Sequence, residues 1–156
     1  MLPEITTFKA LINKALVEFV GEIQQEKWFG KERELISRFA FTKLIRLTGK
    51  HPLFIDPAQV GIEVRVQQVK GFEKEFVCKD LIIWKDKNQT AWSKDNVPMF
   101  ILEWKHNNGE PSKYDIEWLK KYTTEHPDCV GMAINVQTSP EYSLSVVMVE
   151  SGAITE

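Results

Sequence analysis

Two apolar stretches decide the fold of this chain: FVCKDLIIW from Phe76 to Trp84, and PMFILEWK from Pro98 to Lys105. Their nearly continuous apolar content is typical of strands that are covered on both faces, so the sequence predicts two central strands of a sheet. A polar segment, residues 85–96, separates them. The charged residues inside both stretches stand out, because a buried charge without a partner is strongly unfavourable.

Two amphipathic helices are expected before these strands. Apolar residues recur at helical spacing from Pro3 to Lys27 and again from Gly30 to Leu47, and Gly49 followed by Pro52 ends the second run. The segment 51–59 that follows has no regular period, so we expect a loop there.

The remaining pattern is that of a mixed α/β domain. Apolar and polar residues alternate from Ile62 to Gln67, which predicts a strand with one face toward solvent. A helix is expected over 112–125, and strands over 129–136 and 144–149. The order is helix, helix, three strands, helix and two strands, with no repeat or linker. We therefore expect one α/β domain over residues 1–156, in which the first helix is an accessory layer or a dimer contact.

Length and composition exclude several classes of protein. The chain has 156 residues, of which 43% are hydrophobic, and 20 Lys plus Arg against 22 Asp plus Glu give a formal net charge of −2. The molecule as a whole does not attract nucleic acid, so any anion-binding surface must be local. No apolar run reaches the roughly 18 to 20 residues that span a bilayer. Two cysteines and no signal segment predict a reduced, cytoplasmic protein.

Three charged residues of the two central strands are expected to lie together. Asp80 lies in KDLIIW, and Glu103 and Lys105 occupy alternate positions of FILEWK. Side chains two positions apart on a strand point to the same face, so Glu103 and Lys105 share one side. Two adjacent carboxylates suit Mg²⁺, which activates water, and an ammonium can orient that water or stabilise the charge of a phosphodiester under attack.

The second helix supplies a further carboxylate. At about 100° per residue, Glu32 falls within the apolar stripe that contains Leu35 and Phe39, whereas Glu34 points away from it. Because this stripe faces the sheet, we expect Glu32 to point toward the strands that hold the other charged residues.

At these residues the sequence resembles the PD-(D/E)XK nuclease superfamily. Its motif positions have counterparts here: the aspartate in Asp80 of KDLII, the (D/E)-x-K in Glu103-Trp104-Lys105, and the helical glutamate of the archaeal Holliday-junction-resolvase branch in Glu32 of GKERELI. The αβββαβ order of its restriction-endonuclease-like core, a central mixed sheet flanked by helices, is similar to the order expected over 30–136. The chain departs from the family at Lys79, where proline is common, and in its extra N-terminal helix.

The resemblance implies a nuclease that hydrolyses nucleic-acid phosphodiesters, with DNA the more common substrate and RNA the substrate of some members. It implies Mg²⁺, or Mn²⁺ in its place, bound by Asp80, Glu103 and the main-chain carbonyl of Trp104. It also implies an assisting role for Glu32 and a position for Lys105 near the attacking water. A homodimer is a further implication, because one site cuts one strand.

Basic and aromatic residues outside the motif are candidates for nucleic-acid contacts. They lie on the expected helix 112–125 and in the polar segment 85–96: Lys113, Tyr114, Lys121 and Trp92. Aromatic rings that stack on bases, beside cations that contact phosphates, are typical of single-strand binding surfaces. A solvated helix face would explain the three helical residues equally well.

Other interpretations of the same residues stay open. Asp80, Glu103 and Lys105 would also suit a structural salt-bridge network at a strand end, and Glu32 would suit a salt bridge from helix to sheet with Lys105. The protein would then be a catalytically inactive nuclease-fold module that binds nucleic acid or another protein. A metal-dependent enzyme that acts on a different phosphate-bearing substrate is the third alternative.

Overall fold

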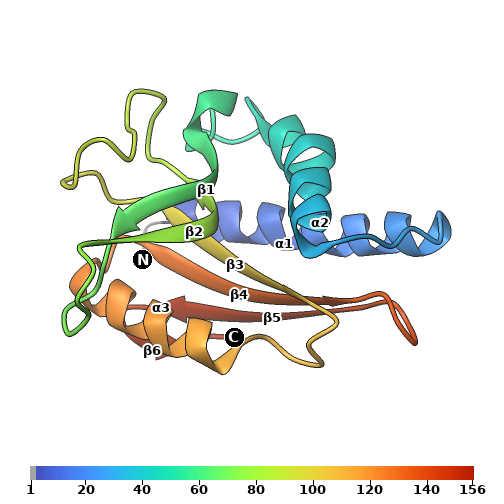
Figure 1. The fold of residues 1–156 in the computed structure, drawn as a ribbon. Coiled ribbons are helices and arrows are strands. Elements are labelled where there is room, and N and C mark those ends of the chain that lie inside the picture. Colours follow the sequence, from blue (N-terminus) through green and yellow to red (C-terminus); the bar gives the residue numbers. More distant parts are fainter. Residues whose placement is uncertain (1–2) are drawn as a thin grey trace.

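The computed structural model describes residues 3–156, and its elements follow the expected order (Figure 1). The helices are α1 (Pro3–Gln25), α2 (Glu32–Phe39) and α3 (Lys113–Glu125). The strands are β1 (Val60–Gln67), β2 (Phe76–Ile83), β3 (Phe100–His106), β4 (Val130–Gln137), β5 (Ser143–Glu150) and β6 (Ala153–Ile154). The short β6 and a 3₁₀ turn over Pro57–Gln59, within the expected loop 51–59, have no counterpart among the elements that the sequence predicts.

All six strands form one mixed sheet in the order β1-β2-β3-β4-β5-β6. β1, β2 and β3 are antiparallel neighbours, β4 is parallel to β3, and β5 and β6 are again antiparallel. α3 makes the connection that two parallel neighbours require. The expectation of an α/β domain with a mixed sheet is confirmed, and the apolar strands β2 and β3 lie inside the sheet.

Helices cover the sheet on both sides, with α1 and α2 on one side and α3 on the other (Figure 1). Two cores result. The α1–α2 core contains apolar residues of both helices and of the sheet, among them Phe8, Leu16, Phe19, Leu35, Phe39, Leu81, Leu102 and Trp104. The α3 core contains Ile82, Ile101, Trp118, Leu119, Tyr122 and Ala133, among others. Because seven residues of α1 are buried, this helix belongs to the main core and is not an accessory layer.

The helix expected over residues 30–47 is α-helical only in its first part. It continues as a π-helical turn over Ala40–Leu44 and a 3₁₀ turn over Ile45–Leu47. The Thr42 hydroxyl donates to the carbonyl of Arg38 at 2.6 Å, and a side chain inserted in this way disturbs the regular backbone bonding of a helix. Hydrophobic spacing does not detect the change, because the apolar side chains stay on the same side.

The alternation predicted for β1 is confirmed in its exposure, because Glu63, Arg65 and Gln67 are exposed and the apolar residues between them are buried or half-buried. The apolar residues do not all face the same core, however. Ile62 packs against the α1–α2 core, whereas Val64 and Val66 pack in the α3 core. Between them, Glu63 has a φ of 54°, a left-handed conformation that is uncommon for a residue with a side chain. The strand therefore turns over at Glu63 and serves both cores.

Within residues 3–156, none of the helices combines the length and the apolarity needed to cross a bilayer. Both cysteines are free thiols, Cys78 on the surface and Cys129 in the interior. Burial raises the pKa of the Cys129 thiol, although the charge of Lys85 opposes the shift, so the thiol acts as a small apolar side chain of the α3 core.

Candidate active site

The pairing of β2 with β3 stops at Leu81 and Leu102, one residue short of the two predicted carboxylates. Beyond this point, side chains take over the hydrogen bonding between the strands. The backbone N–H of Asp80 donates to Oε2 of Glu103 at 3.0 Å, and the N–H of Trp104 donates to Oδ2 of Asp80 at 2.8 Å. Each carboxylate thus holds the backbone of the other strand. The structure brings Asp80 and Glu103 together, as the sequence predicts.

Glu103 is a buried carboxylate. Burial raises the pKa of its carboxyl to about 7, because the charged form loses its hydration, while the nearby Lys79 opposes the shift and Asp80 adds to it. A carboxylate in this state gains more from an adjacent cation than an exposed one does, since water does not stabilise its charge.

The cation beside Glu103 is Lys79, which the sequence analysis did not place in the site. Its Nζ lies 2.5 Å from Oε1 of Glu103, and the two side chains are 4% and 5% exposed. The same ammonium lies 3.6 Å from the centre of the Trp118 ring on α3. The available signal was a lysine inside an apolar strand, at the position where the resembling family commonly has proline.

Lys79 reaches Glu103 because β2 turns over. On a regular strand, Lys79 and Leu81 would share one face. Here Leu81 packs in the α1–α2 core, whereas Lys79 lies against Trp118 on the α3 side. The change occurs at Asp80, whose place in the β1–β2 register is opposite Glu63, the residue at which β1 turns over. Both strands of this hairpin therefore change face at the candidate site.

Lys105 lies on the same side of β3 as Glu103, which confirms the alternation argument. Its Nζ is 3.8 Å from Oδ2 of Asp115 on α3, and its side chain is 37% exposed. Asp115 lies in the first turn of α3, where its N–H donates to the capping hydroxyl of Ser112 at 3.2 Å. Asp115 was not predicted as a partner of Lys105, although an acidic residue in the first turn of that helix is visible in the sequence.

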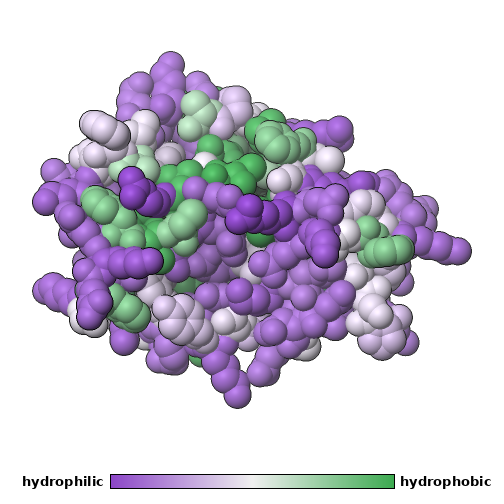
Figure 2. Space-filling model, viewed as in Figure 1, coloured by the Kyte–Doolittle hydropathy of each residue, from purple (hydrophilic) through white to green (hydrophobic). Residues whose placement is uncertain are grey.

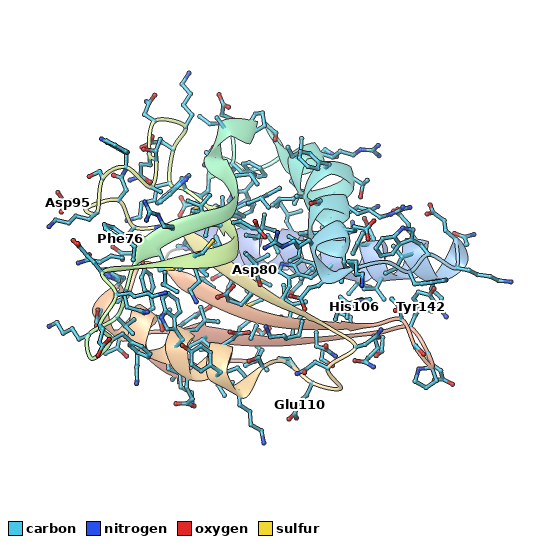
Figure 3. All side chains as sticks on the ribbon, in the orientation of Figure 1. Phe76, Asp80, Asp95, His106, Glu110 and Tyr142 are labelled. Atoms are coloured by element: carbon cyan, nitrogen blue, oxygen red, sulfur yellow. The ribbon has the colours of Figure 1, made fainter. Side chains whose placement is uncertain are left out.

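Glu32 approaches β3 from the other side of the sheet. It is half-buried at the start of α2 while Glu34 is exposed, so the predicted orientation is confirmed. Burial lowers the pKa of His106, and the negative charge of Glu32 opposes this shift in part. Figure 3 shows His106 near the N-terminal end of α2. In the described part of the chain, no hydrogen bond or ion pair joins Glu32 to Asp80 or Lys105, so the alternative salt bridge is not formed.

The predicted metal ligands offer hard oxygen donors. Oδ1 of Asp80 accepts no hydrogen bond from residues 3–156. The Trp104 carbonyl points toward β2, because the N–H and C=O of a strand residue point to the same side and this N–H donates to Asp80. Glu103 has a partner on each oxygen but keeps lone pairs, since a carboxylate has about four acceptor sites. This donor set fits Mg²⁺, which needs one or two carboxylates and completes its shell with water and phosphate oxygens.

The protein itself would supply only part of such a shell. Within residues 3–156, there is no group of three or more His, Cys, Asp or Glu side chains that could hold a metal ion. A divalent cation at Asp80 and Glu103 would therefore depend on water or substrate for most of its ligands, which is the usual situation for Mg²⁺ in phosphoryl-transfer sites.

A pocket of about 140 Å³ lies between α2 and β1. It is lined by Arg33, Ile36, Ser37, Ile62 and Glu63. Nε of Arg33 is 2.8 Å from Oε1 of Glu63, which links the first turn of α2 to the point where β1 turns over. Figure 2 shows apolar surface between α2 and β1 in the upper part of the view, with hydrophilic surface around it.

The four candidates for nucleic-acid contacts are all on the surface. Trp92 is 97% exposed in the loop between β2 and β3. Lys113 and Tyr114 are exposed at the start of α3, and Lys121, also exposed, lies 5.5 Å from the ring centre of Phe72.

The sequence matches no family model, and no curated protein and no solved structure is detectably similar to it. What this site can do chemically is therefore inferred from the residues themselves. The central features are the reciprocal hydrogen bonds of Asp80 and Glu103 and the buried ammonium of Lys79, at the point where β2 and β3 stop pairing.

Proposed function

We propose that this protein is a metal-dependent nuclease of PD-(D/E)XK type that hydrolyses phosphodiester bonds of nucleic acid, with DNA preferred over RNA. The observation that carries the proposal is the pair of reciprocal hydrogen bonds between Asp80 and the backbone of β3, and between Glu103 and the backbone of β2. These bonds hold two carboxylates side by side where the strands part, and rigid placement on strands is what a catalytic metal site needs.

The arrangement of the elements supports this proposal. From α2 to β4 the order is helix, three strands, helix and strand, with β1, β2 and β3 antiparallel and β4 parallel to β3. This is the αβββαβ order of a restriction-endonuclease-like core. In this interpretation β5 and β6 extend the sheet, and α1 completes the core beneath α2.

Each proposed residue has a role that its position supports. Asp80, Glu103 and the Trp104 carbonyl would hold the divalent cation. Bound there, Mg²⁺ or Mn²⁺ would lower the pKa of a water and neutralise charge on the phosphate. The partly exposed ammonium of Lys105 would orient the attacking water or stabilise the charge on the phosphate oxygens. Glu32 would assist from α2.

Substrate contacts would come from the exposed basic and aromatic residues: Lys113, Tyr114, Lys121 and Trp92. Because only two of these residues are cations, few phosphates would be contacted, so the affinity should depend only weakly on salt concentration. Cutting both strands of a duplex would then need a second copy of the chain, that is, a homodimer.

A catalytically inactive binding module is the second candidate, and Lys79 favours it. Its ammonium neutralises Glu103 in the interior of the protein, as expected of a structural ion pair. The two candidates differ in their response to metal. A nuclease should gain stability with Mg²⁺ or Mn²⁺ through Asp80 and Glu103, whereas a binding module should not.

Metal-dependent cleavage tests the proposal. Duplex DNA, single-stranded DNA, RNA and small phosphate esters are incubated with the protein at low salt, with Mg²⁺, Mn²⁺ or EDTA. Lys105→Ala should reduce cleavage by about a hundredfold or more, because a preorganised charge on the transition state is lost. Asp80→Asn should abolish it. Both variants should remain folded by circular dichroism.

Lys14→Ala is the matched control, since Lys14 is an exposed lysine of α1 that takes no part in the candidate site. It should cleave at the wild-type rate. Cleavage that survives both EDTA and Lys105→Ala would refute the proposed site. No cleavage of any substrate, together with no metal-dependent stabilisation, would favour the inactive binding module.

A further inference from the structure

We infer that Lys79 is the internal counter-ion of the candidate site: its ammonium neutralises Glu103 in the metal-free protein, and a divalent cation takes its place on binding. This inference rests on the proposed function, because it requires Asp80 and Glu103 to be metal ligands. It assigns Lys79 a positioning role that neither the motif nor the strand pattern indicates.

The first argument is the environment of the ammonium. An ammonium removed from water needs compensation from partners, and Lys79 has two. Its Nζ lies 2.5 Å from Oε1 of Glu103 and 3.6 Å from the ring centre of Trp118, with 4% of the side chain exposed. The carboxylate and the aromatic face therefore share one cation between them.

The second argument is the orientation of Glu103. Its Oε1 is held by Lys79, and its Oε2 accepts the N–H of Asp80. The two bonds fix both oxygens, so the carboxylate is directed toward Asp80 without any metal. A site prepared in this way needs little rearrangement of its ligands when a cation arrives.

The third argument is electrostatic. A divalent cation bound between Asp80 and Glu103 would lie within a few ångströms of the Lys79 ammonium, whose side chain is only 4% exposed. Like charges repel strongly under these conditions. The ammonium must therefore leave Glu103, and the ring of Trp118 offers it a place to remain. That ring is itself fixed, because Nε1 donates to Gln68 at 2.6 Å and the ring stacks on Tyr122.

The other lysine of the site does not fill this role. Lys105 is paired with Asp115 at 3.8 Å and is partly exposed. Within residues 3–156, no Lys or Arg side chain other than Lys79 forms an ion pair with Asp80 or Glu103. The inference therefore predicts opposite effects for the two lysines: Lys105 supports cleavage, whereas Lys79 competes with the metal.

The test compares metal binding by the full chain with and without the Lys79 charge. Melting temperature and calorimetric binding of Mn²⁺ are measured for wild type, Lys79→Met and Lys79→Gln, at about pH 8.5, where protons compete least for the ligands. Gln keeps a hydrogen-bond donor for Glu103 without the charge. Both variants should melt at a lower temperature than wild type in EDTA. Both should bind Mn²⁺ about tenfold more tightly or better, and Mn²⁺ should raise their melting temperatures more than that of wild type.

Lys9→Met is the matched control, because Lys9 forms a largely buried ion pair with Glu150, away from the candidate site. It should also melt earlier in EDTA, but its response to Mn²⁺ should equal that of wild type. This control separates the loss of any buried ion pair from the loss of the particular charge that competes with the metal.

The outcomes separate this inference from the proposed function. If wild type shows a metal response that Asp80→Asn removes, but the Lys79 variants respond no more than wild type, Lys79 is not the counter-ion and the nuclease proposal stands. If neither wild type nor the Lys79 variants respond to metal, both ideas fail. Variants that fold only with Mn²⁺ would support the inference. Variants that stay unfolded even with Mn²⁺ would overturn it, since no cation then replaces the ammonium.

Discussion

The two faces of the sheet bury different kinds of side chain. The α1–α2 face is packed by aromatic and aliphatic residues, such as Phe8, Leu16 and Phe39. Among residues 3–156, the buried carboxylates and the buried ammonium lie on the α3 face: Lys79, Glu103 and Asp115. One face of the sheet is thus packed mainly by apolar contacts, whereas the other holds the buried ion pair of Lys79 with Glu103.

The difference has a physical origin at the opening between β2 and β3. Buried charges are tolerated only where partners satisfy them, and the end of the β2–β3 pairing leaves backbone N–H groups free to do so. The α1–α2 face holds fewer such groups, and its ion pair of Lys9 with Glu150 likewise supplies each charge with a partner. Its one unsatisfied polar group among the described residues is Nε1 of Trp104, which is buried without a hydrogen-bond acceptor.

The largest expected loss of stability comes from removing one member of the buried ion pair on the α3 face. Glu103→Leu would leave the Lys79 ammonium buried without its carboxylate, which should lower the free energy of unfolding by about 3 to 5 kcal/mol. The double variant Lys79→Met with Glu103→Leu removes both charges and should recover most of this loss. Urea unfolding in EDTA measures both. If the single and double variants were equally unstable, the pair would contribute through packing and not through charge.

Truncating a buried side chain of the α1–α2 core should reduce stability somewhat less and should leave metal binding unchanged. Leu16→Ala opens a cavity in the α1–α2 core and should cost roughly 2 to 5 kcal/mol. Val17→Ala is the control on the next residue of α1, which is 63% exposed, and should change stability by less than about 0.5 kcal/mol. The stability of Leu16→Ala should still rise with Mn²⁺ as in wild type. A lost metal response would mean that the two faces are not independent.

The smallest expected effect is a pH dependence confined to the charged face. The pKa of Glu103 is raised from 4.5 to about 7 in the folded protein. The folded state therefore keeps a proton that the unfolded chain releases, so the stabilisation from this group is complete below about pH 4.5 and is lost as the pH rises through 7. Relative to Glu103→Gln, wild type in EDTA should lose roughly 1 to 3 kcal/mol across this range.

Urea unfolding at a series of pH values measures that difference, and Leu16→Ala serves as the control for the apolar face. Its stability should follow that of wild type at every pH, displaced by a constant amount. A difference between wild type and Glu103→Gln that does not change with pH would mean that the Glu103 carboxyl titrates as an exposed group, in conflict with its burial.

Much of the site could be predicted because it depends on local periodicity. Alternation along β3 correctly placed Glu103 and Lys105 on one side, and helical spacing correctly turned Glu32 inward and Glu34 outward. The convergence of Asp80 with Glu103 followed from two neighbouring apolar strands, each of which carries a charge that needs a partner.

The parts that sequence reasoning missed depend on departures from that periodicity. A regular strand would place Lys79 on the α1–α2 side, and β1 would bury Ile62 and Val64 in one core. The structure does neither, because the hairpin turns over at Glu63 and Asp80. The partner of Lys105 was also missed, since Asp115 comes from α3 and only packing decides which helix face meets the sheet.

The sequence by itself determined the order of the elements, the mixed α/β class and the presence of two carboxylates on central strands, because hydrophobic spacing and the cost of burying charge are local properties. Only the tertiary structure decided that α1 belongs to the core and that Lys79 is the cation beside Glu103. Both depend on contacts between segments distant in the chain. The left-handed backbone of Glu63 is also decided by packing. A residue with a side chain seldom adopts this conformation, so the local sequence does not predict it.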